Sequence, residues 1–570
     1  YWIPTYDHPD DKTTWEISVL TDSGESALSN GKLVSKRSVK GGTLWSWAQT
    51  KPASTYLMSV VTGKYTVVTD HWGKVPVEYW TYPDSVAAAR LGFGKTPDAI
   101  DVFSRKTGIP YPWAKYAQSV VPDFIFGGME NVSATTQNDD GILHPAWAEP
   151  QYNADGLMSH ELGHQWFGDL LTTRDWSHAW LNEGFATFME QTYREASQGV
   201  DEATWDRMDA EDQTIEADRR NRRSIVYNKY VTDPIEIFFS GHIYPKGATV
   251  LQMLRHQLGD SLFWSAMHHY AASHMYGNVV TADLERAFEE STGRNHKTFF
   301  DEWVYGAGFP VFRVSSSYDS ATKRLTLHAD EIQPRDSLTG NFDADVDVEV
   351  LTDGAPSRAA MRVRDGKGDL TIALPSAPRA IEWNKGSWVL ALTDFPRSTA
   401  MLDYQLSHSD DVASRNEALT LLSARSHDAA AARAIATDSH VDRFWGLRAR
   451  AVALLASFPN DSVARDAAIA AVRDSDSRIR QAAVGVLASF PGADAETLLA
   501  SESRGDASPI VRGFALASYI KVAGDAALPL AGQVMAEHSW RDVLRTPAMR
   551  VLKGMQSPAA HELYQKYAKQ

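Results

Sequence analysis

Two histidines and a glutamate stand together in the segment HELGH, which runs from His160 to His164. On a helix, residues i and i+4 lie on the same face one turn apart, so His160 and His164 can point their imidazoles at one metal ion. Glu161 follows the first histidine, where it can reach a metal-bound water without being a ligand itself. The spacing therefore predicts a catalytic zinc site.

Such a site needs a third ligand, because catalytic zinc takes three protein ligands and keeps one position for water. Glu183 fits this role, since it lies in NEGFA at the start of an expected helix, with eighteen residues between it and His164. We predict one Zn²⁺ per chain, bound by His160, His164 and Glu183 in a His₂Glu site of the thermolysin type. Glu190 lies further along the same helix face, either as a hydrogen-bond partner of a ligand histidine or as an ordinary helix residue.

A second motif, FGGMENVS, spans Phe126 to Ser133, upstream of the histidines. Read alone, its glycine pair indicates a turn. Together with HELGH and NEGFA it resembles the signature of the gluzincin zinc aminopeptidases, the family of aminopeptidase N and leukotriene-A hydrolase. That signature is G-x-M-E-N, then HExxH, eighteen residues and Glu. The resemblance extends from the first residues of the chain to GFPVFRV, which ends at Val314, and more loosely beyond it.

The resemblance implies a role for each residue of the second motif. Glu130 would bind the free α-amino group of a substrate, and a carboxylate at that place would exclude internal peptide bonds, which carry no charge there. Gly127 and Gly128 would let the backbone run alongside the substrate like an added strand. Met129 and Asn131 complete the substrate-binding motif. The implied substrates are peptides with a free N-terminus.

The segment GHIYPKGATVLQML, from Gly241 to Leu254, resembles the Y-x-K-G stretch of the same family. By this resemblance, Tyr244 would donate a hydrogen bond to the oxyanion of the tetrahedral intermediate. Without the family, a tyrosine before a proline would be interpreted as a packing residue. Glu161 would act as general base towards the attacking water and then as general acid towards the leaving amine.

Two features depart from the family pattern. Pro4 to Pro9 match its PCxDxP-like segment with Thr5 in place of the usual cysteine. Most of the family's first domain is missing before this segment, including a glutamine that in relatives helps Glu130 hold the amine. Either a partner chain supplies the missing strands, or the amine site is assembled differently. The second departure is a C-terminal region that is more regularly HEAT-like than in most relatives.

Two other functions remain open from the sequence. An endopeptidase of the thermolysin type would use the same metal site, although an amine-binding Glu130 argues against internal cleavage. A scaffold protein that has lost its chemistry would bind partners through its C-terminal helices, although every expected catalytic side chain is present. Cleavage of blocked and unblocked peptides tests the first alternative, and a metal assay tests the second.

The composition is that of an ordinary soluble globular protein, with 43% hydrophobic and 22% charged residues in a chain of 570. Nucleic acids and anionic membranes would repel a net charge of −16, so neither is expected as a partner. No stretch reaches the roughly 20 apolar residues of a membrane span. The chain has no cysteine, which excludes disulfides and thiolate sites. This absence, with a first residue that is not Met, favours an exported protein, periplasmic or extracellular.

The rest of the chain must position these residues, and its patterns predict a multidomain α+β fold with four domains. Residues 1–66 contain strand-like segments such as STYLMSVVTGKYTVV and would form the C-terminal part of an N-terminal β domain. Residues 67–310 are interpreted as helical segments separated by turns, which form a thermolysin-like catalytic domain. Residues 311–395 alternate between apolar and polar residues and predict a small β-sandwich.

Residues 396–570 predict a C-terminal α-solenoid with HEAT-like repeats. One arginine opens each of five apolar helices, at intervals of 33, 32, 32 and 33 residues: Arg415, Arg448, Arg480, Arg512 and Arg545. A constant period of this length is typical of stacked helix pairs. An irregular helical bundle is the alternative.

Overall fold

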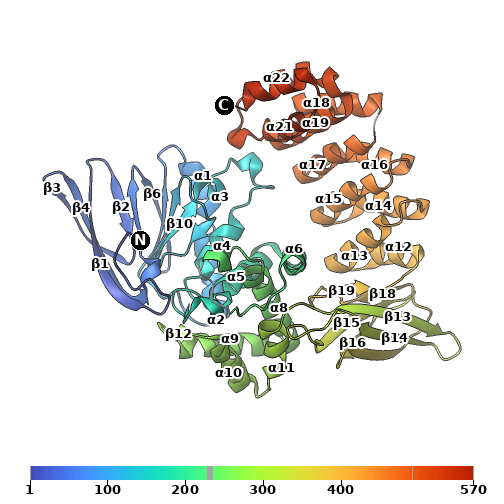
Figure 1. Ribbon diagram of the computed structural model, residues 1–570, viewed down its shortest axis with the longest axis horizontal. Helices are drawn as coiled ribbons and strands as arrows, with labels where there is room; N and C mark the ends of the chain where they lie inside the picture. The colour runs from blue at the N-terminus through green and yellow to red at the C-terminus, as the bar shows by residue number, and fades with distance from the viewer. Residues whose placement is uncertain (1, 228–234, 491, 569–570) are drawn as a thin grey trace.

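A computed structural model describes residues 2–227, 235–490 and 492–568 of the chain. It consists of a β-rich N-terminal part, a mixed α/β part, a β-sandwich and a row of helices that ends at the C-terminus (Figure 1). The multidomain α+β fold predicted from the sequence is confirmed. The division into four domains at residues 66, 310 and 395 stays a prediction.

The N-terminal part contains two small antiparallel sheets. Its strands are β1 (Lys12–Thr21), β2 (Ser26–Ser29), β3 (Lys32–Val39), β4 (Gly42–Ser54) and β5 (Val60–Gly63). Strand β4 lies between β1 and β3, and β2 pairs with β5. Trp45 and Trp47 on β4 pack with Leu28 on β2, and with Trp80 and Ala117 of the next sheet. This buried cluster joins the N-terminal strands to the mixed α/β part.

A five-stranded sheet follows, in the order β6-β7-β8-β10-β9. Its strands are β6 (Thr66–Trp72), β7 (Val75–Thr81), β8 (Tyr116–Val121), β9 (Gly128–Met129) and β10 (Ala134–Asn138). The interpretation of this segment as helical was therefore wrong. Strands such as β8 are buried on both faces, so they lack the polar alternation that identifies a strand. Helices α1 (Val86–Phe93) and α2 (Thr96–Thr107) connect β7 to its parallel neighbour β8, because a parallel pair needs a long crossover.

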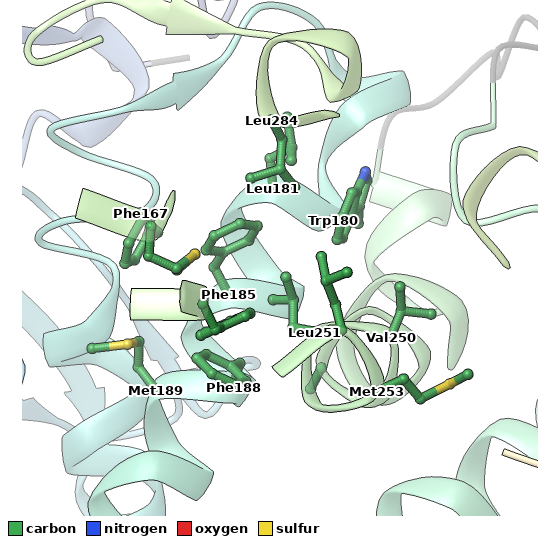
Figure 2. Packing of buried hydrophobic residues seen from close by; sticks show 14 of the residues in the cluster. Phe167, Trp180, Leu181, Phe185, Phe188, Met189, Val250, Leu251, Met253 and Leu284 are labelled. Atoms are coloured by element: carbon green, nitrogen blue, oxygen red, sulfur yellow. The ribbon is translucent and has the colours of Figure 1, made fainter. Parts of the chain in front are cut away.

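Helices make up most of the chain from there to the β-sandwich. They are α3 (Asp139–Ile142), α4 (Asp155–Gly163), α5 (Trp180–Gln198), α6 (Val200–Arg220), α7 (Ile235–Phe238), α8 (Gly247–Leu258), α9 (Asp260–Ser273), α10 (Thr281–Thr292) and α11 (Lys297–Phe300), with the short strands β11 (Thr172–Thr173) and β12 (Asn278–Val279) between them. Figure 2 shows Phe185 of α5 with Phe167 on one side and Leu251 of α8 on the other. The ring centroids of Phe167 and Phe185 are 4.7 Å apart. This packing fixes α5 against α8, and both helices carry predicted site residues or lie next to them.

The β-sandwich consists of a four-stranded and a three-stranded sheet, in the orders β17-β14-β13-β19 and β16-β15-β18. Its strands are β13 (Val311–Asp319), β14 (Arg324–Glu331), β15 (Ala344–Leu351), β16 (Ser357–Val363), β17 (Lys367–Ala373), β18 (Ala380–Trp383) and β19 (Leu392–Asp394). Buried residues alternate with exposed ones along β14, as expected for a strand with one face in the core. Leu325 and Leu327 of one sheet share a core with Val346 and Val348 of the other.

The C-terminal part is helical throughout. Its helices are α12 (Thr399–His408), α13 (Val412–Ser423), α14 (Ala429–Val441), α15 (Trp445–Leu454), α16 (Ser462–Ala471), α17 (Ser477–Val486), α18 (Ala493–Gly505), α19 (Pro509–Ala523), α20 (Leu528–Val534), α21 (Thr546–Gly554) and α22 (Pro558–Tyr567). Figure 1 shows the pairs α12 and α13, α14 and α15, and α16 and α17 stacked in chain order above the β-sandwich. The HEAT-like repeat stays a prediction.

The periodic arginines connect successive helix pairs. The first four each pair with an acid that follows the next helix: Arg415 with Asp442, Arg448 with Asp474, Arg480 with Asp506 and Arg512 with Glu537. The fifth, Arg545, pairs instead with Asp542, three residues before it. Arg480 makes two bonds to Asp506, from Nε at 2.7 Å and from Nη2 at 2.9 Å. Because an ion pair of this kind recurs at the first four arginines, their regular spacing in the sequence has a structural reason.

The last part of the helical region, from α19 to the start of α21, contacts the mixed α/β part. Ile510 and Val543 pack on Ala148, and Arg541 Nη1 donates to the carbonyl oxygen of Asp140 at 3.0 Å. In the described part of the chain one stretch, Pro509–Val534, has the length and mean hydropathy (1.2) of a membrane span. It comprises α19, a 3₁₀ turn and α20, whose apolar residues contribute to the core of the last helices.

Candidate active site

The two histidines of HELGH lie at the end of α4 and face a carboxylate on α5. His160 Nε2 lies 3.5 Å and His164 Nε2 3.2 Å from the same oxygen, Oε2 of Glu183. The three residues each offer a ligand atom within 4.8 Å of the others. Gly163 permits the approach of α4 to α5, since a Cβ there would lie 3.0 Å from Met189 Cβ. The structure thus brings the three predicted ligands together.

The second nitrogen of each imidazole also has a neighbour. His164 Nδ1 lies 3.1 Å from the carbonyl oxygen of Phe167. Because a carbonyl only accepts, Nδ1 carries a hydrogen, and in the neutral ring Nε2 keeps its lone pair towards Glu183. His160 Nδ1 lies 3.6 Å from Oε2 of Glu190, whose role the sequence left open. The Nε2 atoms of both histidines thus lie close to one carboxylate oxygen of Glu183. A catalytic zinc site uses this set of donor atoms.

The charges in this cluster shift the pKa values of its members. Burial alone would raise the pKa of Glu183, but His164 and His160 lower it to about 2. Burial also opposes the charged form of His164, yet Glu130 and Glu183 raise its pKa to about 9. Without a metal these histidines hold protons, so a divalent cation has to displace them to bind.

Glu161 is buried beside the histidines, with 4% of its surface exposed. Burial raises the pKa of its carboxyl to about 7. Within the described residues its Oε2 atom has no hydrogen-bond partner, which is costly for a buried oxygen unless a ligand or water uses it. Gly128 lies directly against this carboxylate, and a Cβ at that position would collide with Oε1 of Glu161. Any larger residue at position 128 would therefore force the Glu161 carboxylate to move.

The motif around Gly128 forms an edge of the five-stranded sheet. Strand β9, which is Gly128 and Met129, pairs antiparallel with β10 on one side and has no strand on its other side in the described part of the chain. The carbonyl oxygen of Gly127 accepts a hydrogen bond from the backbone N–H of Asn138, at the end of β10, at 2.9 Å. Asn131 Oδ1 accepts one from Thr136 Oγ1 at 2.9 Å. An edge strand presents unpaired backbone groups, so an extended peptide can pair with β9.

Glu130 directly follows this edge strand and lies close to the predicted metal ligand His164. It is 7% exposed and offers a carboxylate oxygen within 4.8 Å of ligand atoms of Glu161 and His164. Burial raises the pKa of its carboxyl. Its backbone carbonyl accepts a hydrogen bond from Gln165 Nε2 at 3.1 Å. Because Gln165 directly follows His164, the β9 edge and the histidines are held in one rigid frame.

Two residues that the sequence analysis missed contact this site. Tyr56, in the 3₁₀ turn η1 (Thr55–Leu57), donates from its hydroxyl to Oε1 of Glu130 at 3.1 Å. Asn182 precedes Glu183 on α5 and donates from Nδ2 to the Tyr56 hydroxyl at 3.2 Å. The NEG motif contains Asn182 and so offers a signal for it. Nothing near Tyr56 in the sequence indicates a role in the site.

Tyr244, the predicted oxyanion donor, lies next to His160. It belongs to a single π turn, η4 (His242–Lys246), that leads into α8, and its ring stacks on that of His160 with centroids 6.1 Å apart. Burial, followed by the carboxylate of Glu183, raises the pKa of its hydroxyl well above the ordinary value. The hydroxyl therefore keeps its proton and can donate a hydrogen bond.

A cavity of about 680 Å³ opens beside His160 and Tyr244. Helices α5 and α6 form much of its wall, whereas Glu130 does not line it. Its charged lining residues besides His160 are Glu190, Arg194, Asp206 and Asp209. Arg194 already pairs with Asp206 at 2.7 Å, so the wall is acidic overall. Of the predicted metal ligands, His160 lines this cavity.

The chain matches known protein families over the N-terminal strands and over the part that contains the candidate active site. Residues 92–303 match the peptidase family M1 domain, and residues 1–57 match the peptidase M1 N-terminal domain. The leucyl aminopeptidase of Saccharolobus solfataricus is 30% identical over 351 residues, which cover 60% of this chain and 43% of that protein. Aminopeptidase N of Streptomyces lividans is 30% identical over 328 residues, which cover 55% of this chain and 38% of that protein. The chain thus spans less than half the length of these curated relatives.

A solved structure shares the fold over nearly the whole chain. The crystal structure of Legionella pneumophila aminopeptidase A in complex with aspartic acid superposes with a TM-score of 0.75. It is 16% identical and covers 99% of this chain, while the chain covers 69% of that protein. At this level of identity the likeness concerns the fold alone.

Proposed function

The chain contains domains of the peptidase M1 family, and on this premise we propose that it is a zinc-dependent aminopeptidase that hydrolyses the N-terminal residue from peptides. One observation carries the proposal. The buried carboxylate of Glu130 lies next to a His₂Glu donor set, at the free edge of a short strand. A cationic N-terminus bound there is held beside the metal site, so the first peptide bond is the one placed for attack.

His160, His164 and Glu183 would hold the zinc ion. Peptidases of this family are zinc metalloenzymes, and the convergence of two imidazole nitrogens and one carboxylate oxygen supports the same ion here. When bound, zinc polarises the scissile carbonyl and lowers the pKa of a water molecule. Glu190 and the Phe167 carbonyl orient the two imidazoles from behind.

Glu161 would move the protons of the reaction. Its Oε2 atom is free to accept a hydrogen bond from the attacking water, and a pKa of about 7 in the metal-free chain suits a group that both takes and returns a proton near neutral pH. Glu161 takes the proton of the water and passes it to the leaving amine. Tyr244, whose hydroxyl stays protonated, donates a hydrogen bond to the developing oxyanion.

The substrate would lie across the site with its two ends in different surroundings. Its first residue pairs with β9, where Gly127 and Gly128 allow close approach, and its ammonium group binds Glu130 with Met129 and Asn131 beside it. The rest of the peptide extends past His160 and Tyr244 into the cavity lined by α5 and α6. Substrates are therefore peptides with a free N-terminus.

A pair of substrates tests the proposal on the intact chain. Zinc content is first measured in the purified protein, and then hydrolysis of leucine 4-nitroanilide is compared with that of its N-acetylated form. We expect about one zinc per chain and cleavage of the free amine only. A longer peptide should lose residues one at a time from its N-terminus, as followed by mass spectrometry. Cleavage within an N-acetylated peptide would instead show an endopeptidase, and a zinc-loaded chain without any activity would favour a scaffold.

A further inference from the structure

We propose that Tyr56 positions the amine-binding carboxylate of Glu130 through a hydrogen-bond chain that begins at the backbone of Thr173 and passes through Asn182. This inference rests on the proposed function, because it assigns a task within the same substrate site. The chain has three links: Thr173 N–H to Asn182 Oδ1 at 3.1 Å, Asn182 Nδ2 to the Tyr56 hydroxyl at 3.2 Å, and the Tyr56 hydroxyl to Glu130 Oε1 at 3.1 Å.

Only one direction of donation satisfies all three links. A backbone N–H can only donate, so Thr173 fixes Oδ1 of Asn182 on its side and turns Nδ2 towards Tyr56. A hydroxyl has one hydrogen and two lone pairs. Since the Tyr56 oxygen accepts from Asn182, its hydrogen is free to point at Glu130. A hydrogen bond donated by the Tyr56 hydroxyl favours the ionised form of the Glu130 carboxylate, against the effect of burial.

The turn that carries Tyr56 is itself anchored to the substrate motif. The carbonyl oxygen of Leu57 accepts from Asn131 Nδ2 at 3.4 Å and from Asn30 Nδ2 at 3.1 Å. Asn30 also donates to the carbonyl oxygen of Val132 at 2.8 Å. The Tyr56 ring stands edge-on to Trp176, with centroids 5.2 Å apart. The phenol therefore has little freedom to leave Glu130, because both its backbone and its ring are held.

The consequence for the site is a carboxylate with a fixed orientation. With Oε1 held by Tyr56, the Glu130 carboxylate cannot rotate, and its second oxygen has a defined direction for the substrate ammonium group. A preorganised group of this kind binds its ligand without first losing rotational freedom. Tyr56 comes from the N-terminal part of the chain, so that part contributes directly to amine recognition. The NEG motif thus has two roles in this proposal. Glu183 is a predicted metal ligand, and Asn182 donates the hydrogen bond that orients the Tyr56 hydroxyl.

The test is the variant Tyr56→Phe in the full chain, which keeps the ring and removes only the hydroxyl. Tyr65→Phe is the matched control, because Tyr65 belongs to the same part of the chain and its hydroxyl donates to the carbonyl oxygen of Val120 at 2.9 Å, away from the metal ligands. For Tyr56→Phe we expect kcat/KM on leucine 4-nitroanilide to fall roughly tenfold. The loss should lie mainly in KM, with zinc content and melting temperature equal to those of the control.

A double-mutant cycle separates positioning from general structural damage. In a Glu130→Ala background, Tyr56→Phe should change kcat/KM by less than about twofold, because the group that accepts the Tyr56 hydrogen bond is gone. Asn182→Ala leaves the Tyr56 ring untouched and should lower kcat/KM in the same direction, again only when Glu130 is present. It serves as the second variant if Tyr56→Phe proves unstable.

The possible results distinguish this inference from the proposed function. If the unmodified protein cleaves free and N-acetylated substrates equally, the proposed aminopeptidase function fails, whatever the tyrosine variants do. If it requires the free amine and Tyr56→Phe behaves like Tyr65→Phe, the function stands and the positioning role is wrong. An equal loss from Tyr56→Phe with and without Glu130 also overturns the inference, since Tyr56 would then act elsewhere.

Discussion

Gly184 and Gly247 face each other where α5 meets α8, so closely that a Cβ on either residue would lie 2.9 Å from the Cα of the other. Gly184 directly follows the predicted zinc ligand Glu183, and Gly247 directly follows the π turn that carries Tyr244. The glycines of the NEG and Y-x-K-G motifs are therefore the two halves of one contact. This contact sets how near Tyr244 comes to the predicted metal ligands His160 and Glu183.

Substitution of Gly247 by alanine should impair catalysis without removing the metal. The added methyl group has to push η4 and α8 away from α5, which moves Tyr244 from its place beside His160. We expect kcat to fall at least tenfold while zinc content is unchanged, since a displaced oxyanion donor costs on the order of 10²-fold. Gly485→Ala is the control, because Gly485 lies in α17 with no atom within 4 Å of its would-be Cβ. Equal kcat values in the two variants would contradict this account.

The variant Glu161→Gln tests the general base directly. Glutamine fills the same buried space but cannot take a proton, and the predicted metal ligands are untouched. We expect zinc content to stay the same and kcat to fall by about 10²- to 10⁴-fold. Zinc is measured by atomic spectroscopy and kcat with a saturating aminoacyl anilide. A zinc-replete variant with unchanged kcat would rule out Glu161 as the base.

The variant Glu130→Ala tests the exopeptidase assignment. Removal of a charge-assisted hydrogen bond costs roughly 1.5–3 kcal/mol, which is about one to two orders of magnitude in kcat/KM. We expect that loss on a free aminoacyl anilide, with zinc retained, and a smaller gap between free and N-acetylated substrates. If the variant cleaves the free substrate as well as the unmodified protein does, Glu130 does not bind the amine.

The arginine bonds of the C-terminal helices predict unequal effects on stability. Arg480→Ala leaves the carboxylate of Asp506, 2% exposed, without its ion-pair partner, and breaking a buried pair typically costs about 3–5 kcal/mol. Arg465 pairs with Asp494 at the surface of the same stack, where both side chains are 34% exposed or more. Such a pair contributes about 0–1 kcal/mol. Calorimetry should show a clear drop in melting temperature for Arg480→Ala and almost none for Arg465→Ala, with zinc content equal in both.

The local parts of the site could be predicted because they depend on spacing along a helix. His160 and His164 lie one turn apart wherever that segment is helical. For Gly128 the family resemblance implied a close approach to the substrate, and the structure shows a different close neighbour, the carboxylate of Glu161. Tyr56 could not be found in this way. Its partner Glu130 lies 74 residues further on, and only the packing of the N-terminal strands against the five-stranded sheet brings the two together.

The fold was predicted unevenly for a similar reason. The first four C-terminal arginines recur at a nearly constant interval and each pairs with an acid after the next helix, so their period is visible in the sequence. Strands β8 and β9 were not recognised, because β8 is buried on both faces and β9 consists of two residues. A strand that short has no periodicity of its own. Its existence depends on pairing with β10, which is a tertiary contact.

A buried carboxyl on α6 makes the stability of the protein depend on pH. Glu211 is 9% exposed and accepts a hydrogen bond from Ser387 Oγ at 2.7 Å. Burial raises its pKa from 4.5 to about 8, although Arg207 opposes the shift. Between these two values the folded chain holds a proton that the unfolded chain has released. The contribution of Glu211 to the free energy of unfolding therefore falls as pH rises through this window, and it becomes constant above about pH 8.

The variant Glu211→Gln should remove this dependence, because glutamine is uncharged at every pH and can still accept the bond from Ser387. Relative to the unmodified protein, we expect its melting temperature to be nearly equal at pH 4.5 and higher by a few degrees at pH 9. Glu562→Gln, an exposed change on α22, should show no such trend. The comparison needs differential scanning calorimetry at both pH values with the same zinc loading. A gain that is the same at pH 4.5 and pH 9 would mean that Glu211 is already ionised in the folded chain across the window, and its bond to Ser387 would then be one to a buried anion.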